Sequence, residues 1–298
     1  MKPAPFVYHA PSSVDEALGL LEDLREDDAK VLAGGQSLMP LLNMRLARPA
    51  HLVDINGLND LNFMRGTDGG GLAVGALTRH RSLERSPNVA RLIPLLVEAI
   101  PFVGDRQVRF RGTIGGSLAH ADPVAELPTV ALALDAELVI GGPSGHHTVP
   151  ASDFFLDFLT TALEPPDLLL EVRFPPPERS AGYAFLELAR QLGAYAIVSA
   201  AAMIALEDGR ISSARLCLGG VGPTPIRVRR AEALLVGQQP GPEAFSAAAR
   251  LAAEQTDPGA DVHASAAYRR DMAEVYARRA LELAASRAAT NHDSRGSA

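Results

Sequence analysis

Two short segments of the chain carry the residue types that a phosphate-binding loop needs. Residues 32–45 read LAGGQSLMPLLNMR and residues 111–123 read RGTIGGSLAHADP, so each places adjacent glycines in apolar sequence and follows them with serine. Glycine leaves main-chain N–H groups uncovered and permits positive φ, while Ser and Thr add hydroxyl donors. Each segment therefore suits a pyrophosphate; the alternative interpretation is a tight turn or a close packing point.

The motifs of the commonest nucleotide sites are missing from both segments. Neither contains the Rossmann pattern G-x-G-x-x-G with an acidic residue about 20 positions later, nor the P-loop pattern G-x-x-x-x-G-K-[ST]. NAD on a Rossmann unit and ATP on a P-loop are therefore poor candidates. A diphosphate held between two separate loops fits a long dinucleotide that lies across a crevice between subdomains.

Composition limits the remaining function classes. The chain has 298 residues, of which 47% are hydrophobic and 21% charged, as expected for a globular protein of two or three domains. Its formal net charge of −7 argues against a nucleic-acid-binding protein. The one cysteine, Cys217, lies in an apolar strand-like run and predicts a buried thiol. A single cysteine forms no intramolecular disulfide and cannot ligate an iron–sulfur cluster in the usual way.

No targeting or metal motif is evident. Prolines near the N-terminus interrupt any signal-peptide core, and no apolar run is long enough to span a membrane, so we expect a cytoplasmic protein. His146 and His147 have no third ligand nearby, so we predict an exposed turn there and no metal site.

The hydrophobic pattern predicts an α+β fold that begins with two α/β zones. In residues 1–57, Ser13 and Glu16 form a capping-box pattern at the start of an amphipathic helix. Residues 58–177 form the second zone, which ends at the stiff triplet Pro175–Pro177. The expected strands of the two zones are residues 29–34, 51–55, 71–77, 136–142 and 168–174, and the expected helices are 13–27, 88–100 and 123–136.

Residues 178–290 predict a separate α+β domain. Two β-compatible runs, 196–206 and 211–221, are joined by Glu207-Asp208-Gly209-Arg210, and Asp-Gly between such runs is a strong hairpin signal. Helices are expected after the hairpin, at residues 229–236, 242–255 and 264–285, and residues 291–298 are expected to form a disordered tail.

The paired motifs also support a resemblance. The runs AGGQSLMPLLNMRL, LVDIN, TIGGSLAHADPVAELP and DLLLEVRFP together resemble the FAD-binding medium subunit of molybdenum hydroxylases of the carbon monoxide dehydrogenase and xanthine dehydrogenase type. The resemblance extends to about residue 285. It implies a two-subdomain FAD-binding unit like that of vanillyl-alcohol oxidase and p-cresol methylhydroxylase, followed by a small domain with an antiparallel sheet and helices.

The resemblance also implies roles for particular residues. The FAD pyrophosphate would lie between two groups of residues: Ala33, Gly34, Gly35, Gln36, Ser37 and Leu38 from the first segment, and Thr113, Ile114, Gly115, Gly116 and Ser117 from the second. An acidic residue, Glu126 or its neighbour Asp122, would bind the flavin side, and Leu169 or Leu170 would pack on the adenine or the isoalloxazine ring. Tyr195 would cover the flavin and govern access to it; the alternative is an ordinary strand aromatic.

By the same resemblance, the chain would be an electron-transfer subunit. FAD would be bound non-covalently, a small partner subunit would carry [2Fe–2S] clusters, and a large partner subunit would carry molybdopterin, in a dimer of heterotrimers. Electrons would leave through the flavin to a quinone, oxygen or NAD. A protein with a vestigial flavin site and a scaffold role is the alternative.

Overall fold

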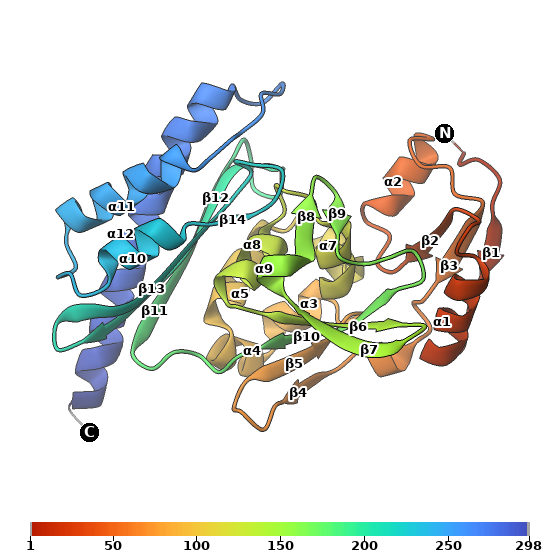
Figure 1. The fold of residues 1–298 in the computed structure, drawn as a ribbon, viewed down its shortest axis with the longest axis horizontal. Helices are drawn as coiled ribbons and strands as arrows, with labels where there is room; N and C mark the ends of the chain where they lie inside the picture. Colours follow the sequence, from red (N-terminus) through yellow and green to blue (C-terminus); the bar gives the residue numbers. More distant parts are fainter. Residues whose placement is uncertain (1, 297–298) are drawn as a thin grey trace.

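The computed structural model describes residues 2–296, which form three units along the chain (Figure 1). In the first unit, Ser13 caps the first helix as its side chain accepts the Glu16 N–H, confirming the predicted helix start. A three-stranded parallel sheet of order β1-β3-β2 lies beside that helix. The elements of this unit are β1 (Val7–His9), α1 (Val14–Asp23), β2 (Ala29–Leu32), α2 (Leu38–Asn43) and β3 (His51–Asp54).

The second unit is built on a five-stranded antiparallel sheet of order β4-β5-β10-β6-β7, with helices packed beside it (Figure 1). Its strands are β4 (Met64–Gly66), β5 (Leu72–Gly75), β6 (Glu137–Gly142), β7 (Gly145–Pro150), β10 (Leu168–Phe174) and the small pair β8 (Phe155–Asp157) and β9 (Thr160–Thr161). Its helices are η1 (Asn59–Leu61), α3 (His80–Arg85), α4 (Pro87–Leu92), α5 (Pro94–Ala99), η2 (Ile100–Phe102), α6 (Arg106–Arg111), α7 (Ile114–His120), α8 (Glu126–Ala133) and α9 (Ala151–Phe154).

One predicted helix of this unit is wrong in extent. The run 88–100 was expected as a single helix, but the chain breaks at Ile93 and resumes at Pro94, so α4 and α5 are separate. Proline lacks the N–H that a continuous helix needs and disfavours helical geometry at the residue before it. His146 and His147 are exposed as predicted, although they lie on the edge strand β7 and not in a turn.

The third unit is a four-stranded antiparallel sheet of order β11-β12-β13-β14 with helices along one face (Figure 1). The predicted hairpin is confirmed: Asp208 and Gly209, with φ of 50° and 73°, join its two long strands. The sequence interpretation missed strand β11. The elements are β11 (Ala181–Ala189), β12 (Ala196–Glu207), β13 (Arg210–Gly219), β14 (Ile226–Arg227), α10 (Arg229–Leu235), α11 (Pro242–Glu254) and α12 (Ala266–Gly296).

The end of the chain differs from its prediction. Helix α12 continues to Gly296, within the range 291–298 for which a disordered tail was expected, and residues 297 and 298 lie outside the described part. Asn291 donates to the carbonyl of Ala181 and so ties this last stretch to β11. Cys217 is buried on β13 as expected, and burial raises the pKa of its thiol.

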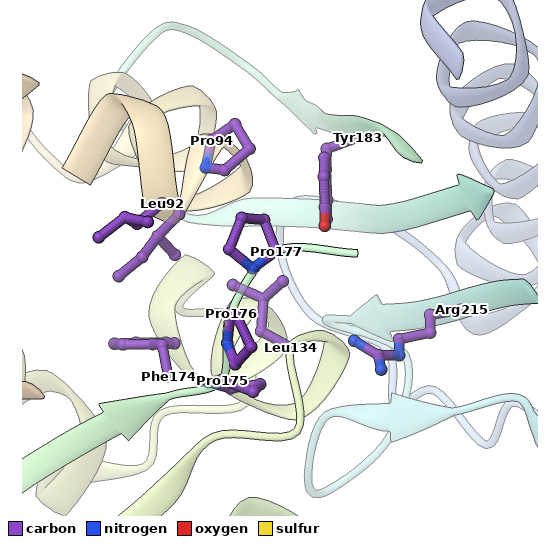
Figure 2. Close-up of a pocket in the computed structure, with 10 residues that line it drawn as sticks. Leu92, Pro94, Leu134, Phe174, Pro175, Pro176, Pro177, Tyr183 and Arg215 are labelled. Atoms are coloured by element: carbon purple, nitrogen blue, oxygen red, sulfur yellow. The ribbon is translucent and has the colours of Figure 1, made fainter. Parts of the chain in front are cut away.

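The second and third units are joined by ion pairs and by tight packing. Arg287 of α12 binds Glu98 of α5 at 2.5 Å, and Arg215 of β13 binds Asp135 at 3.2 Å. Pro175–Pro177, Tyr183 and Arg215 are among the residues that line a cavity of about 10 Å³, room for one water molecule (Figure 2). This cavity shares no lining residue with either glycine-rich segment.

Within residues 2–296, no helix is long and apolar enough to cross a membrane.

Candidate functional site

The first glycine segment, residues 33–38, is the turn between β2 and α2. Gly35 has a φ of +73°, a conformation that favours glycine, and the Gln36 side chain donates to the Gly34 carbonyl at 2.9 Å. In the described part of the chain, the main-chain N–H groups of residues 34–38 donate to no protein acceptor. Five consecutive unpaired donors on a partly exposed turn suit an anion.

The second glycine segment, residues 113–117, has a different structure from the open loop that was expected. It begins helix α7, with Thr113 as the N-cap: its hydroxyl accepts the Gly116 N–H at 3.1 Å. The N–H groups of Ile114, Gly115 and Ser117 donate to the carbonyls of Thr78, Ala76 and Thr113 in turn. The expectation that this segment presents a row of bare main-chain amides is therefore wrong. Within the described residues, the groups that it leaves without a protein partner are the Thr113 N–H and the Ser117 hydroxyl.

Close packing explains the glycines of the second segment. A Cβ at Gly115 would lie 2.5 Å from the Cβ of Ala76 and 2.7 Å from its carbonyl oxygen. At Gly116 the same atom would lie 2.8 Å from the Thr113 hydroxyl and 3.6 Å from the Cβ of Ala33. Gly115 is thus a packing point, as the alternative interpretation held, whereas Gly116 faces the first segment.

The structure brings the two segments together, although they are about eighty residues apart. A Cβ at Gly34 would lie 2.5 Å from the Arg111 carbonyl oxygen and 2.8 Å from the Cα of Gly112. Gly34 therefore permits the first segment to contact the residues that lead into the second. The segment with the unpaired amides therefore lies next to the segment that contains the Ser117 hydroxyl.

Positive side chains accompany this junction, and the sequence interpretation missed them. Arg79 donates to the Arg111 carbonyl at 2.5 Å and to the Asn56 side chain at 2.8 Å. The guanidinium groups of Arg79 and Arg111 lie close enough that Arg111 lowers the pKa of Arg79, in addition to the larger effect of burial. Two guanidinium groups beside free amides favour a ligand with more than one negative charge.

His80 contacts the same junction at Gly112. Its main-chain N–H donates to the Gly112 carbonyl at 3.0 Å, and its ring is almost fully buried. Burial, together with the nearby Arg109 and Arg79, lowers the pKa of His80 to about 4, so the ring is neutral at physiological pH. Of the residues at this junction, Asn56 lies in a run quoted from the sequence, LVDIN, and the pattern of that run indicates a strand and nothing more.

Three acidic residues lie close to one another around the start of α8. Glu126, the first residue of α8, has a pKa raised to about 7 by burial and by Asp122. Glu187 on β11 has a pKa raised to about 8 by burial and by Glu126, and neither of its oxygens has a hydrogen-bond partner. We call Asp122, Glu126 and Glu187 the acidic cluster.

Tyr195 stands at the edge of the acidic cluster. It lies between β11 and β12 with 70% of its surface exposed, so it is not an ordinary strand aromatic. Partial burial raises the pKa of its phenol, and Asp122 and Glu126 raise it further, which places the ring near both carboxylates. The sequence prediction named Asp122, Glu126 and Tyr195; the structure brings these three together.

The two leucines proposed for ring packing point into different parts of the core. Leu169 lies in the main core of the second unit, whereas Leu170 packs with the first unit in the cluster that includes Ala33. The Leu170 carbonyl also accepts the N–H of Ala76, against which Gly115 packs. Leu170 is therefore the leucine connected to both glycine segments.

Comparison with known proteins gives the family. Residues 4–177 match the model of the FAD binding domain in molybdopterin dehydrogenase, and residues 183–284 match the CO dehydrogenase flavoprotein C-terminal domain. The chain is a flavoprotein subunit of the molybdopterin dehydrogenase family. The family prediction made from the sequence is confirmed, as is the α+β fold with its antiparallel C-terminal sheet and helices.

Relatives of this flavoprotein subunit are similar over their whole length. The 6-hydroxypseudooxynicotine dehydrogenase complex subunit alpha of Paenarthrobacter nicotinovorans is 42% identical and covers 99% of each chain. The carbon monoxide dehydrogenase medium chain of Hydrogenophaga pseudoflava is 39% identical, covering 97% of this chain and 100% of its own. A solved structure of the carbon monoxide dehydrogenase from H. pseudoflava, lacking the Mo-pyranopterin moiety, superposes with a TM-score of 0.94 at 41% identity, over 96% of this chain and 99% of its own.

No group of three or more histidine, cysteine, aspartate or glutamate residues within the described residues could hold a metal ion. The donors that the flavoprotein subunit does present are amides, hydroxyls and guanidinium groups, whose chemistry suits a diphosphate.

Proposed function

We propose that this flavoprotein subunit binds FAD non-covalently and passes electrons from the [2Fe–2S] clusters of a partner subunit to an external acceptor. The observation that carries the proposal is the row of unpaired N–H groups in residues 34–38, which lies against the second glycine segment and beside Arg79 and Arg111. These donors are preorganised for the diphosphate of a dinucleotide.

Each segment would hold the diphosphate through different groups. The first segment supplies main-chain N–H groups, and we infer roles there for Ala33, Gly34, Gly35, Gln36, Ser37 and Leu38. The second segment supplies the Ser117 hydroxyl, and Gly116 faces the first segment, while Thr113, Ile114 and Gly115 hold the start of α7 in place. Leu170 is the better placed of the two leucines to contact the cofactor.

The flavin end of the cofactor would lie toward the acidic cluster. Glu126 and Asp122 lie near the exposed Tyr195, so a ring bound there would contact a phenol on one side and carboxyl groups on another. Tyr195 would then control how an acceptor reaches the ring. FAD, when bound, supplies the exchange between single-electron and two-electron transfer, and the chain's residues set its position and access.

The molybdopterin and the [2Fe–2S] clusters would belong to partner subunits. Cys217 is the one cysteine of the chain, it is buried, and four cysteinates are the usual ligands of such a cluster. Relatives named as a medium chain and as a subunit of a dehydrogenase complex support a heteromeric assembly, which we propose to be a dimer of heterotrimers in the cytoplasm. The two relatives are named for different substrates, so the substrate would be decided by the partner subunit.

Gly35→Ala tests the cofactor site. The wild-type chain should be yellow, with absorbance near ~450 nm and about one FAD per chain. In the variant, a φ of +73° strains the new side chain, so the turn and its amides should shift and FAD affinity should fall about tenfold or more. The measurement is FAD titration by flavin fluorescence.

Gly237→Ala is the matched control for that experiment. Gly237 has a φ of +81° with open space around the position of a Cβ, so it carries similar backbone strain away from the site. Its variant should bind FAD as the wild type does. A colourless wild-type chain that acquires no FAD would contradict the proposal and favour a vestigial site with a scaffold role.

The electron-transfer role needs the assembled complex. After reduction by dithionite, the iron–sulfur absorbance of the complex should recover rapidly when a quinone or oxygen is added. Removal of FAD should slow this recovery, and added FAD should restore it. Recovery at the same rate without FAD would show that electrons leave by another route.

A further inference from the structure

Asn56 and Arg79 form a continuous hydrogen-bonded link between the two glycine segments. The Asn56 Nδ2 donates to the Ala33 carbonyl at 2.6 Å, in the first segment. Its Oδ1 accepts from the Arg79 Nη2 at 2.8 Å, and the Arg79 Nη1 donates to the Arg111 carbonyl at 2.5 Å, at the entry to the second segment. We call these two side chains the clasp.

The Asn56 side chain is fixed from behind. Asp54 Oδ1 accepts both the main-chain N–H of Asn56, at 2.9 Å, and its Nδ2, at 2.6 Å. Partial burial raises the pKa of Asp54, but hydrogen bonds from Asn56 and Tyr8 outweigh it and hold that pKa below its ordinary value. A charged Asp54 is a strong acceptor, so it holds the amide in the orientation that reaches Ala33.

The Arg79 end is equally constrained. Arg79 forms an antiparallel bridge with Thr113, and the next residue, His80, donates its N–H to Gly112. A planar guanidinium presents donors in a fixed fork, which lets one side chain serve two acceptors at once. Here the two acceptors are Asn56 Oδ1 and the Arg111 carbonyl, which belong to the first and second units of the fold.

The clasp acts where the segments already touch. The Arg111 carbonyl that accepts from Arg79 is also the atom that would collide with a Cβ at Gly34. Its position therefore depends on one hydrogen bond and one contact, from residues on both sides of the junction.

We propose that Asn56 and Arg79 are positioning residues that fix the spacing of the two glycine segments and so preorganise them to bind one diphosphate together. The inference rests on the proposed FAD site. With the clasp intact, binding does not have to order one segment against the other; without it, that ordering opposes binding. Neither residue has to contact the cofactor for this effect.

The test compares Asn56→Ala, Arg79→Lys and the double variant by FAD titration of the full chain. Lysine keeps the positive charge but lacks the fork that reaches both acceptors. Each single variant should weaken FAD binding about 10- to 100-fold, the loss typical of a hydrogen bond to a charged group. Because both substitutions break one link, the double variant should be weaker than the worse single variant by no more than about threefold.

Tyr8→Phe is the control. It removes the 2.7 Å hydrogen bond from Tyr8 to Asp54, at the outer end of the same network, and leaves the clasp intact, so FAD affinity should not change. Wild-type affinity in Arg79→Lys would overturn the clasp and reduce Arg79 to a source of charge. Independent, multiplying losses in the double variant would overturn it as well. If Asn56→Ala does not fold, as judged by circular dichroism, Arg79→Lys alone decides.

The wild-type titration separates this inference from the proposed function. A wild-type chain that binds no FAD contradicts the function itself, whereas normal FAD binding with insensitive variants contradicts only the clasp.

Discussion

The two glycine segments look alike in sequence but differ in structure. In the first, Gly35 takes a positive φ and the amides of residues 34–38 stay unpaired. In the second, every main-chain N–H from Ile114 to Ser117 has a protein acceptor, and Gly115 packs closely on Ala76. The comparison teaches that one glycine pair leaves main-chain N–H groups unpaired, while the other lets a helix approach the end of a strand closely.

Gly115→Ala should have the largest effect, and the effect should be on folding. Its Cβ would lie 2.5 Å from the Cβ of Ala76, and no flexible side chain is available to move aside. Overpacking of this kind costs about 1–3 kcal/mol, sometimes more. Urea unfolding should show this loss of stability in the FAD-free chain, where cofactor binding contributes nothing.

Gly19→Ala is the matched control, because nothing lies within 4 Å of a Cβ at that helical glycine. It should leave stability unchanged or raise it slightly, since alanine favours a helix. A Gly115→Ala chain as stable as wild type but unable to bind FAD would break the comparison, because the second segment would then resemble the first.

Substitution of Ser117 and of Ser37 tests the same comparison between the two segments through FAD affinity. Ser117 contributes the hydroxyl that the second segment leaves without a protein partner, whereas Ser37 lies among free amides that can bind without it. Ser117→Ala should weaken FAD binding about fivefold to tenfold, and Ser37→Ala by no more than about threefold. Isothermal titration with FAD measures both; a larger loss from Ser37→Ala would reverse the assignment of donors.

Local sequence predicted much of this arrangement. The helix start at Ser13 and the hairpin at Asp208 and Gly209 were correct because each depends on residues close together in the chain. The Glu16 carboxylate accepts from Ser12, one residue before the Ser13 N–H that the capping-box pattern predicts. Adjacent glycines in apolar sequence are also a local signal, and they drew attention to two segments that the structure places against each other.

What the sequence could not predict depends on contacts between distant residues. The acceptors of the second segment, Thr78 and Ala76, are far from it in sequence, so its amides looked free when they are not. Arg79 and Asn56 carry no motif of their own and gain significance only where they meet. Glu187 was missed because strand β11 was missed, and its raised pKa arises from burial against another unit.

A last prediction concerns the protonation of the acidic cluster. Glu126 and Glu187 have pKa values raised to about 7 and about 8, mainly by burial. In the unfolded chain both carboxyls titrate near ~4.3. The folded chain therefore binds more protons than the unfolded chain between these limits, and its stability should fall as pH rises from about 5 to about 8.

Glu187→Gln isolates that contribution. Glutamine keeps the shape without a proton to lose, so the free energy of unfolding should decline less between pH 5 and pH 8 than in the wild type. Glu207→Gln, at an exposed position on β12, should leave the wild-type slope unchanged. Urea unfolding across this pH range measures all three chains. If Glu187→Gln keeps the full slope, Glu187 is charged at neutral pH and burial does not hold its proton.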